Sequence, residues 1–322
     1  MGKPKLAKIK GSKLDDVIFV EDVDVKVDGK KGVDMVVLGD IDDFSFSSRG
    51  NKTILTDGDG GIIQLKHVEG VLFDGGTPSD ISDDVYYNVE LGTVTRLDAS
   101  VDAAGQTSGG NLLVGSGIPA SDFVVVANEA AGVEVGLQVI YRQGPSVDPV
   151  SIDTDGTVHF QVATGAQSTA NGSFANHAGR AAWSFEYSVI SGTDGSGTDL
   201  SDYAVIMSID VDVTQGVDYR TFTLVESTLT STGYLWADEN GTPVIGDDSG
   251  NSQVVQNSEN FAFGFIENHI DADPDSPGQQ DYSDGGFGEA EFDILLEVRD
   301  NDGDLVAQNH IVVDVVDDFA FV

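Results

Sequence analysis

Short apolar runs bounded by Gly, Asp and Asn recur along the chain and limit what it can fold into. Typical runs are DFVVVAN at 122–128 and EFDILLEV at 291–298. Runs of this kind, rich in β-branched residues and bounded by turn residues, predict β-strands. No long stretch has the 3.6-residue period of an amphipathic helix. The sequence therefore predicts an all-β protein.

From residue 85 onward the runs follow one another with glycine-rich turns between them. Many strands without intervening helices predict a large antiparallel β-sandwich of jelly-roll-like type over 85–316. The last two runs are expected to form a long hairpin. The expected strands lie at 85–89, 93–97, 122–127, 133–141, 157–162, 181–190, 203–213, 219–225, 259–266, 290–299 and 304–316.

The charge balance excludes several classes of partner. Acidic residues outnumber Lys and Arg by 55 to 16, which gives a formal net charge of -39. This charge repels nucleic acids and anionic membranes, and no apolar run reaches the roughly 18 residues of a membrane helix. Neither nucleic acid binding nor membrane insertion is expected. Carboxylates this numerous require neutralisation, and the expected cofactor is calcium, which binds oxygen ligands.

The basic residues gather at the N-terminus. The first thirteen residues, MGKPKLAKIKGSK, contain five lysines and no acid. This asymmetry favours head-to-tail self-association, in which the basic arm 1–13 adds an edge strand to the acidic body of a neighbour. A solvated tail is the alternative. The residues expected in the contact are Lys3, Lys5, Leu6, Lys8, Ile9, Lys10 and Lys13.

Three segments resemble the repeats-in-toxin (RTX) family. GSKLDDVI at 11–18 and VDGKKGVDMVVL at 27–38 are similar to its nonapeptide G-G-x-G-x-D-x-U-x, with Lys30 in place of the second glycine, and HVEGVLFDGG at 67–76 is similar to the ending of such arrays. The resemblance implies a small RTX-like β region over 14–77 whose stacked turns hold calcium. The implied ligands are Asp15, Asp16, Asp28 and Asp34.

The end of the chain carries a second resemblance. DDFAFV at 317–322 resembles the terminal signature of bacterial type I secretion substrates, which implies an extracellular or cell-surface location. A last strand with an apolar end is the alternative. The stretch DGGTPSDISDD has no apolar pattern, so a linker is expected at 78–84.

Three other groups of acids have the close spacing of calcium ligands. Each is also explained by a turn or a solvated loop, because Asp-Gly sequences form hairpin turns without an ion. The candidate residues are Asp57 and Asp59, Asp271, Asp273 and Asp275, and Asp300, Asp302 and Asp304.

No catalytic motif is present, so the protein is not expected to be an enzyme. The histidines lack the spacing of a zinc site. Trp183 is expected in the core, whereas Trp236 is a candidate platform for a sugar ring. The favoured interpretation is a secreted, calcium-binding structural protein that self-assembles into an extracellular filament, surface layer or biofilm matrix. The alternatives are a carbohydrate-binding or adhesin module that contacts extracellular polysaccharide and, third, a polysaccharide-active enzyme.

Overall fold

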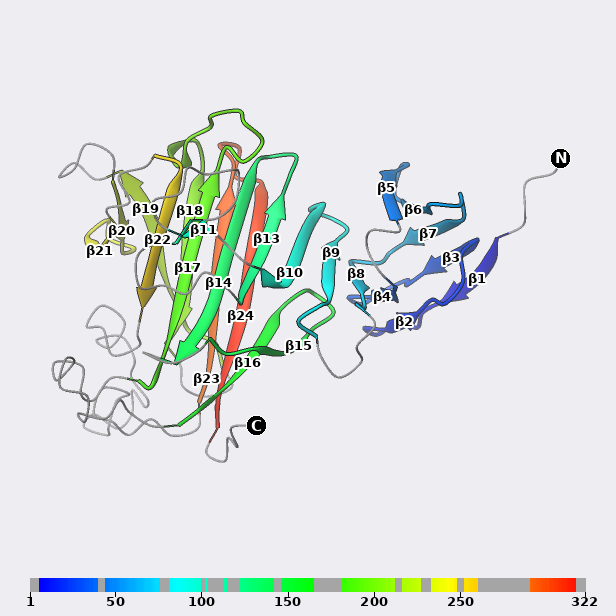
Figure 1. Ribbon diagram of the computed structural model, residues 1–322, viewed down its shortest axis with the longest axis horizontal. Helices are drawn as coiled ribbons and strands as arrows, with labels where there is room; N and C mark the ends of the chain where they lie inside the picture. Colours follow the sequence, from blue (N-terminus) through cyan, green and yellow to red (C-terminus); the bar gives the residue numbers. More distant parts are fainter. Residues whose placement is uncertain are drawn as a thin grey trace. The chain divides into compact units, whose positions relative to one another are not determined.

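The computed structural model (Figure 1) is built almost entirely of β-strands, as the sequence predicts. Within the described residues the one helical element given is a short 3-10 turn, η3 (Leu200–Asp202), and no helix there is long and apolar enough to cross a membrane. The structure describes residues 6–39, 44–75, 81–99, 102–103, 113–114, 122–141, 146–164, 181–211, 216–226, 233–247, 252–259 and 290–316.

The chain divides into two compact units. The first comprises Met1–Leu97 and Ser151–Thr157, and the second comprises Asp98–Val150 and Val158–Val322. The strands of the first unit are β1 (Ala7–Lys10), β2 (Val17–Phe19), β3 (Val25–Asp28), β4 (Met35–Leu38), β5 (Phe44–Ser48), β6 (Thr53–Asp57), β7 (Ile62–Lys66), β8 (Gly70–Phe73), β9 (Val85–Asn88) and β10 (Thr93–Ala99), of which β10 ends in the second unit.

Successive strands of the first unit alternate between two sheets. In one sheet β1, β3 and β7 are parallel neighbours, and in the other β2, β4 and β8 are parallel neighbours. One strand from each sheet makes a rung. Ala7 aligns with Val25 and Val17 with Met35, so a rung is 18 residues long. The antiparallel hairpin β5–β6 is inserted before β7 and pairs with it.

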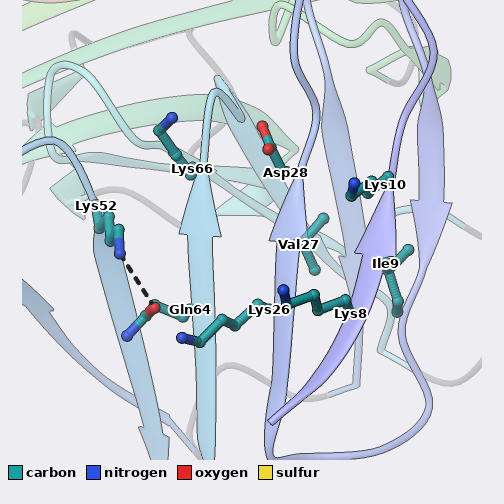
Figure 2. Close-up of a pocket in the computed structure, with 9 residues that line it drawn as sticks. All are labelled: Lys8, Ile9, Lys10, Lys26, Val27, Asp28, Lys52, Gln64 and Lys66. Carbon is teal, nitrogen blue, oxygen red and sulfur yellow. Dashed lines mark hydrogen bonds between the residues drawn. The ribbon is translucent and has the colours of Figure 1, made fainter.

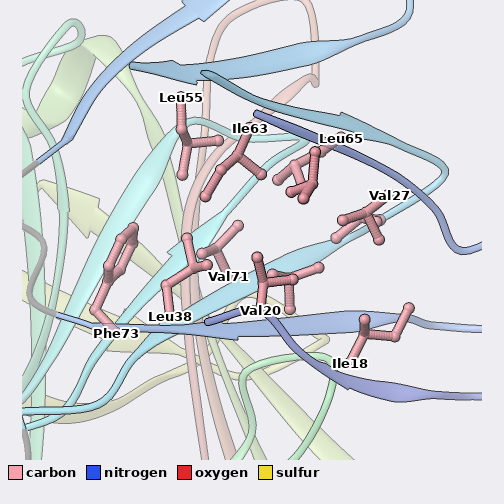
Figure 3. Close-up of a cluster of buried hydrophobic side chains, with 12 residues drawn as sticks. Ile18, Val20, Val27, Leu38, Leu55, Ile63, Leu65, Val71 and Phe73 are labelled. Carbon is pink, nitrogen blue, oxygen red and sulfur yellow. The ribbon is translucent and has the colours of Figure 1, made fainter. Parts of the chain in front are cut away.

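The facing sides of the two sheets form the core of this unit (Figure 3). Side chains at alternate positions of β3 and β7, such as Val27 and Ile63, are buried there, because alternate residues of a strand point to one face. The labelled core residues are Ile18, Val20, Val27, Leu38, Leu55, Ile63, Leu65, Val71 and Phe73.

The boundary between the units lies further along the chain than the expected linker at 78–84. Strand β9 pairs antiparallel with β8, with Phe73 opposite Val85, and β10 pairs with β9. These ladders place residues 85–97 with the first unit. Tyr86 of β9 is buried, and its hydroxyl donates a hydrogen bond to the Thr154 carbonyl. The second compact unit therefore begins after Leu97 rather than at residue 85.

The second unit is a sandwich of two larger sheets. One contains the run β13-β14-β17-β22, and the other contains β16-β24-β23-β18-β19-β20-β21. Their strands are β13 (Phe123–Asn128), β14 (Val133–Tyr141), β16 (Val158–Ala163), β17 (Trp183–Ser191), β18 (Ala204–Asp210), β19 (Tyr219–Glu226), β20 (Tyr234–Ala237), β21 (Pro243–Asp247), β22 (Val254–Glu259), β23 (Ala290–Arg299) and β24 (Leu305–Val316); β11 (Asp102–Ala103) pairs with β12 (Leu113–Val114), and β15 (Pro149–Ile152) leads into the first unit.

Among the described strand pairs of the second unit, β16–β24 and β11–β12 are parallel and the pairs within β13-β14-β17-β22 and β24-β23-β18-β19-β20-β21 are antiparallel. The expected hairpin is present, since β23 pairs antiparallel with β24. Asn309 of β24 is buried, and its amide donates hydrogen bonds to the carbonyls of Val124 (2.8 Å) and Val135 (3.0 Å). This side chain ties the two sheets together. Trp183 lies in the core, as predicted, with its ring 5.9 Å from Phe292.

Candidate metal centre and lysine face

Three carboxylates form a column where the chain passes from the first sheet of rungs to the second. Asp16, Asp34 and Glu69 each precede a strand of the second sheet, and the register of β2, β4 and β8 stacks them. The Asp16 amide donates to Asp34 Oδ1 (3.0 Å), and the Asp34 amide donates to Glu69 Oε2 (2.8 Å). Asp15 lies beside them, and its Oδ1 accepts from the Val33 amide (2.8 Å). We call Asp16, Asp34 and Glu69 the acid column.

Asp34 is the most constrained member of the acid column. Its side chain is fully buried, and its Oδ2 has no hydrogen-bond partner. Burial raises the pKa of this carboxyl, and the charges of Glu69, Asp16 and Asp15 raise it further, against the lowering effect of the Asp16 amide. A buried, unpaired carboxylate oxygen is costly, so this position favours a proton or a cation.

Glycines allow these carboxylate oxygens to approach the backbone closely. A Cβ atom at Gly29 would lie 2.3 Å from Asp34 Oδ2 and 2.1 Å from the His67 carbonyl oxygen. One rung earlier, a Cβ atom at Gly11 would lie 2.8 Å from Asp16 Oδ2 and 2.6 Å from the Gly29 carbonyl oxygen. Each rung thus brings a carboxylate oxygen, and a carbonyl oxygen of the next rung, close to one glycine. Such hard oxygen donors are the ligands that calcium prefers.

The acid column does not by itself form a complete side-chain ligand set. Among the described residues, no group of three or more Asp, Glu, His or Cys side chains could hold one metal ion. Any cation at Gly29 would therefore need backbone carbonyls and water in addition to Asp34.

Lys30 lies between β3 and β4, in the turn that leads to Asp34 of the acid column. Its backbone has a φ of +84°, in the left-handed region that glycine adopts more readily. Its ammonium group donates a hydrogen bond of 2.6 Å to the Gly11 carbonyl. A lysine therefore has a backbone conformation that suits glycine. Its positive charge lies at the Gly11 carbonyl, directly after β1.

The structure brings together three of the four acids that the RTX resemblance implies as ligands. Asp15, Asp16 and Asp34 lie at the column, whereas Asp28 is bound by His67, whose Nδ1 lies 3.0 Å from Asp28 Oδ1. This hydrogen bond, with the nearby charge of Lys66, lowers the pKa of Asp28. The sequence interpretation missed Glu69. Its position directly before β8, equivalent to that of Asp16 before β2, is the signal that identifies it.

The acids at 57–59 and 300–304 lie in hairpin turns of one type. Asp57 Oδ1 accepts hydrogen bonds from the amides of Asp59 (3.0 Å) and Gly61 (2.6 Å). Asp300 Oδ1 accepts in the same way from Asp302 (3.0 Å) and Asp304 (2.9 Å).

In both turns the fourth residue, counted from the accepting aspartate, is a glycine with positive φ. The turn that begins at Asp238 has the same glycine and the same two hydrogen bonds to the aspartate. The structure favours the turn interpretation of Asp57, Asp59, Asp300, Asp302 and Asp304; Asp271, Asp273 and Asp275 lie outside the described residues.

Lys8 and Lys10 belong to a strand rather than to a free arm. β1 is an edge strand of its own sheet and pairs with β3, which corrects the expected separate arm for residues 7–10. Ile9 packs against the core of the first unit, and Leu6 is half-buried. Lys13 is exposed in the following turn, and Lys3 and Lys5 lie outside the described residues.

The outer side of this sheet carries a groove of about 270 Å³ (Figure 2). Lys8 lies opposite Lys26, and Lys26 opposite Gln64, in one row across the strands. Lys10, Asp28 and Lys66 form the next row. Lys52 Nζ lies 3.4 Å from Gln64 Oε1 and extends the first row. We call the five lysines of this groove the lysine face: Lys8, Lys10, Lys26, Lys52 and Lys66.

Trp236 is not a surface platform. Its side chain is fully buried, and its indole Nε1 donates a hydrogen bond of 2.7 Å to the Tyr187 hydroxyl. The two rings meet edge to face with centroids 5.7 Å apart. A sugar ring needs an exposed aromatic face, so the sequence prediction for Trp236 is wrong. The loop-like surroundings of GYLWADENG concealed a core strand, β20.

A polar cluster lies on the face of β23 and β24 that is opposite to the core. His310 Nε2 lies 2.7 Å from Asp293 Oδ1, and the Tyr219 hydroxyl donates to the same oxygen at 3.4 Å. Burial, followed by the charges of Asp293 and Asp210, raises the pKa of Tyr219. These contacts satisfy half-buried polar groups within the sheet.

Comparison with known proteins finds no family model that matches the chain and no similar curated protein. The fold and the site define an all-β protein that joins a unit of stacked two-sheet rungs to a sandwich. Its function is inferred from the acid column and the lysine face.

Proposed function

We propose that the protein is a secreted, calcium-binding structural protein that self-assembles into an extracellular filament, surface layer or biofilm matrix. The observation that carries this proposal is the buried Oδ2 of Asp34, which lies close to the Gly29 backbone together with the His67 carbonyl oxygen. Calcium bound there would neutralise the acid column and tie successive rungs together. The protein has no catalytic role in this proposal.

The net charge of -39 supports a requirement for cations in assembly. Two copies with this charge repel each other through their summed fields, and divalent ions weaken that repulsion. Export to a calcium-rich exterior, which the RTX and type I secretion resemblances imply, would couple folding of the rungs to secretion. The lysine face would contact an acidic surface on a second copy. This contact is the self-association in the proposal.

The test combines calcium calorimetry with light scattering and negative-stain electron microscopy on purified full-length protein. We expect calcium binding, calcium-dependent growth into ordered filaments or sheets, and loss of both in Asp34→Asn. Asp59→Asn removes the same charge from an exposed hairpin turn and serves as the matched control. A wild-type protein that binds no calcium, or that binds it and stays monomeric at all concentrations, contradicts the proposal.

A further inference from the structure

The first row of the lysine face places two lysines opposite each other, and no acid stands at the register positions of this row on β1, β3 and β7. Lys8 and Lys26 are directly opposite each other in register, and Gln64 follows them across the sheet. Like charges in this position destabilise a sheet unless an anion lies between them. With strands spaced about 4.8 Å apart, the row from β1 to β6 is roughly 14 Å long. The second row differs, because Asp28 lies between Lys10 and Lys66.

A complementary surface is present on the second unit of the same chain. The turns after β13, β17 and β23 expose carboxylates, and hydrogen bonds hold these turns together. Asn128 donates to the Val306 carbonyl (2.8 Å), and the Tyr203 hydroxyl donates to the Ala131 carbonyl (3.1 Å). The pKa of Tyr203 is raised by burial and then by Asp194, Asp202 and Asp300, which places these acids near its ring. We call five exposed acids the acidic end: Glu129, Asp194, Asp202, Asp302 and Asp304.

The acidic end has little internal neutralisation. No lysine follows Lys66 in the sequence, and Arg299, beside these turns, is bound to Glu297 Oε1 (2.6 Å) and the Gly303 carbonyl (3.1 Å). The lysine face and the acidic end are thus two concentrated, opposite charges on different units of one chain.

We propose that the lysine face of one copy docks onto the acidic end of a second copy. This inference rests on the self-association in the proposed function and names the two surfaces that meet. A contact between two different surfaces leaves one of each free on a dimer, so it propagates into a filament or closes into a ring. A second copy is favoured as the partner because every copy supplies both charges.

The overall charge gives this contact a distinctive dependence on salt. At low ionic strength the repulsion between two copies of charge -39 opposes encounter. Near 0.1 M salt the Debye length is about 10 Å, which screens the distant charges more than the direct pairs. Assembly is therefore expected to rise with salt and then to fall as the direct pairs are also screened.

A charge-exchange experiment on the full chain tests the pairing. The first variant combines Lys8→Glu, Lys26→Glu and Lys52→Glu. The second combines Glu129→Lys, Asp302→Lys and Asp304→Lys, all at exposed turn positions that leave the hydrogen bonds of Asp300 in place. Each variant alone is expected to associate at least about 100-fold more weakly than wild type, because like charges now meet.

Mixing the two variants restores both opposite pairings, since each reversed surface meets its reversed partner on the other variant. Sedimentation velocity of the equimolar mixture is expected to show assemblies of alternating composition. No recovery in the mixture, with both variants folded by circular dichroism, overturns the proposal. Retained assembly of the lysine variant, with loss of binding to heparin as the probe polyanion, would instead assign the groove to an acidic polysaccharide.

Calorimetry with calcium on the same two variants separates the two proposals. Both keep the acid column, so their calcium binding is expected to equal that of wild type. Absence of calcium binding in every protein contradicts the proposed function alone, whereas failure of the mixture with intact calcium binding contradicts the docking alone.

Discussion

Replacing Asp34 by Asn tests the role of the acid column directly. Asparagine keeps an oxygen that accepts the Asp16 amide and removes the buried charge whose Oδ2 lacks a partner. Without calcium, Asp34→Asn is therefore expected to be at least as stable as wild type. With calcium, wild type gains a ligand-dependent stabilisation that the variant lacks.

The magnitude follows from mass action. An ion that binds only the folded unit stabilises it by about 2.7 kcal/mol when its concentration is 100 times the dissociation constant. For a unit of roughly 100 residues, 1 kcal/mol shifts Tm by about 4–8 °C, so calcium is expected to raise the Tm of the first unit by roughly 10–20 °C. Trp183 and Trp236 both belong to the second unit, so tryptophan fluorescence reports the sandwich and serves as an internal reference for a calorimetric scan.

The pH dependence gives a second readout with a defined sign. The pKa of Asp34 is raised above its ordinary 3.8, so the folded apo protein holds this proton more tightly than the unfolded chain does. The apo protein therefore loses stability as pH rises from 3.8 through the raised pKa. Calcium binds the ionised form, so its stabilising effect is lost as pH falls through the same window. Equal calcium shifts in wild type and Asp34→Asn, or loss of the shift in the control Asp59→Asn, would refute the reasoning.

Three further predictions concern the core and the outer sheet face. Trp236→Ala is expected to destabilise the sandwich by about 3–5 kcal/mol in urea unfolding, because it removes a buried ring and its hydrogen bond to the Tyr187 hydroxyl; a stable variant would contradict the core assignment. Asn309→Leu is expected to cost about 2 kcal/mol in the same assay, since two carbonyls lose their donor. His67→Ala is expected to raise the pKa of Asp28 toward 3.8 in an NMR titration, because their hydrogen bond lowers it; an unchanged value would show that Lys66 dominates.

Strands with a long, regular pattern were predictable from the sequence. The runs at 133–141, 290–299 and 304–316 correspond to β14, β23 and β24. The expected strand at 259–266 lies almost wholly outside the described residues. β20 and β21 were missed, because strands of four or five residues such as YLWA and PVIGD contain too few positions to show a period.

The pairing of strands was less accessible than their existence. The parallel contact of β16 with β24 joins residues such as Val158 and Ile311, about 150 positions apart. A local sequence pattern contains no information about this strand pairing. The acid column was partly accessible, because Asp16 and Asp34 each lie directly before an apolar run. Glu69 became visible only from the register that stacks β8 on β4.

One rung of the first unit separates its charges by geometry. Along β1 and β3, residues such as Ile9 and Val27 point into the core, whereas Lys8 and Lys26 point outward. The acids instead lie in the turns before the second sheet, so the outward lysines of the strands cannot reach the buried oxygen of Asp34. Lys30, itself in a turn, donates a hydrogen bond from its ammonium group to the Gly11 carbonyl. In the proposed function, groups from outside the chain neutralise both surfaces: a cation at the acid column and carboxylates of a second copy at the lysine face. In the proposed function, the same 18-residue rung would link calcium binding to self-association.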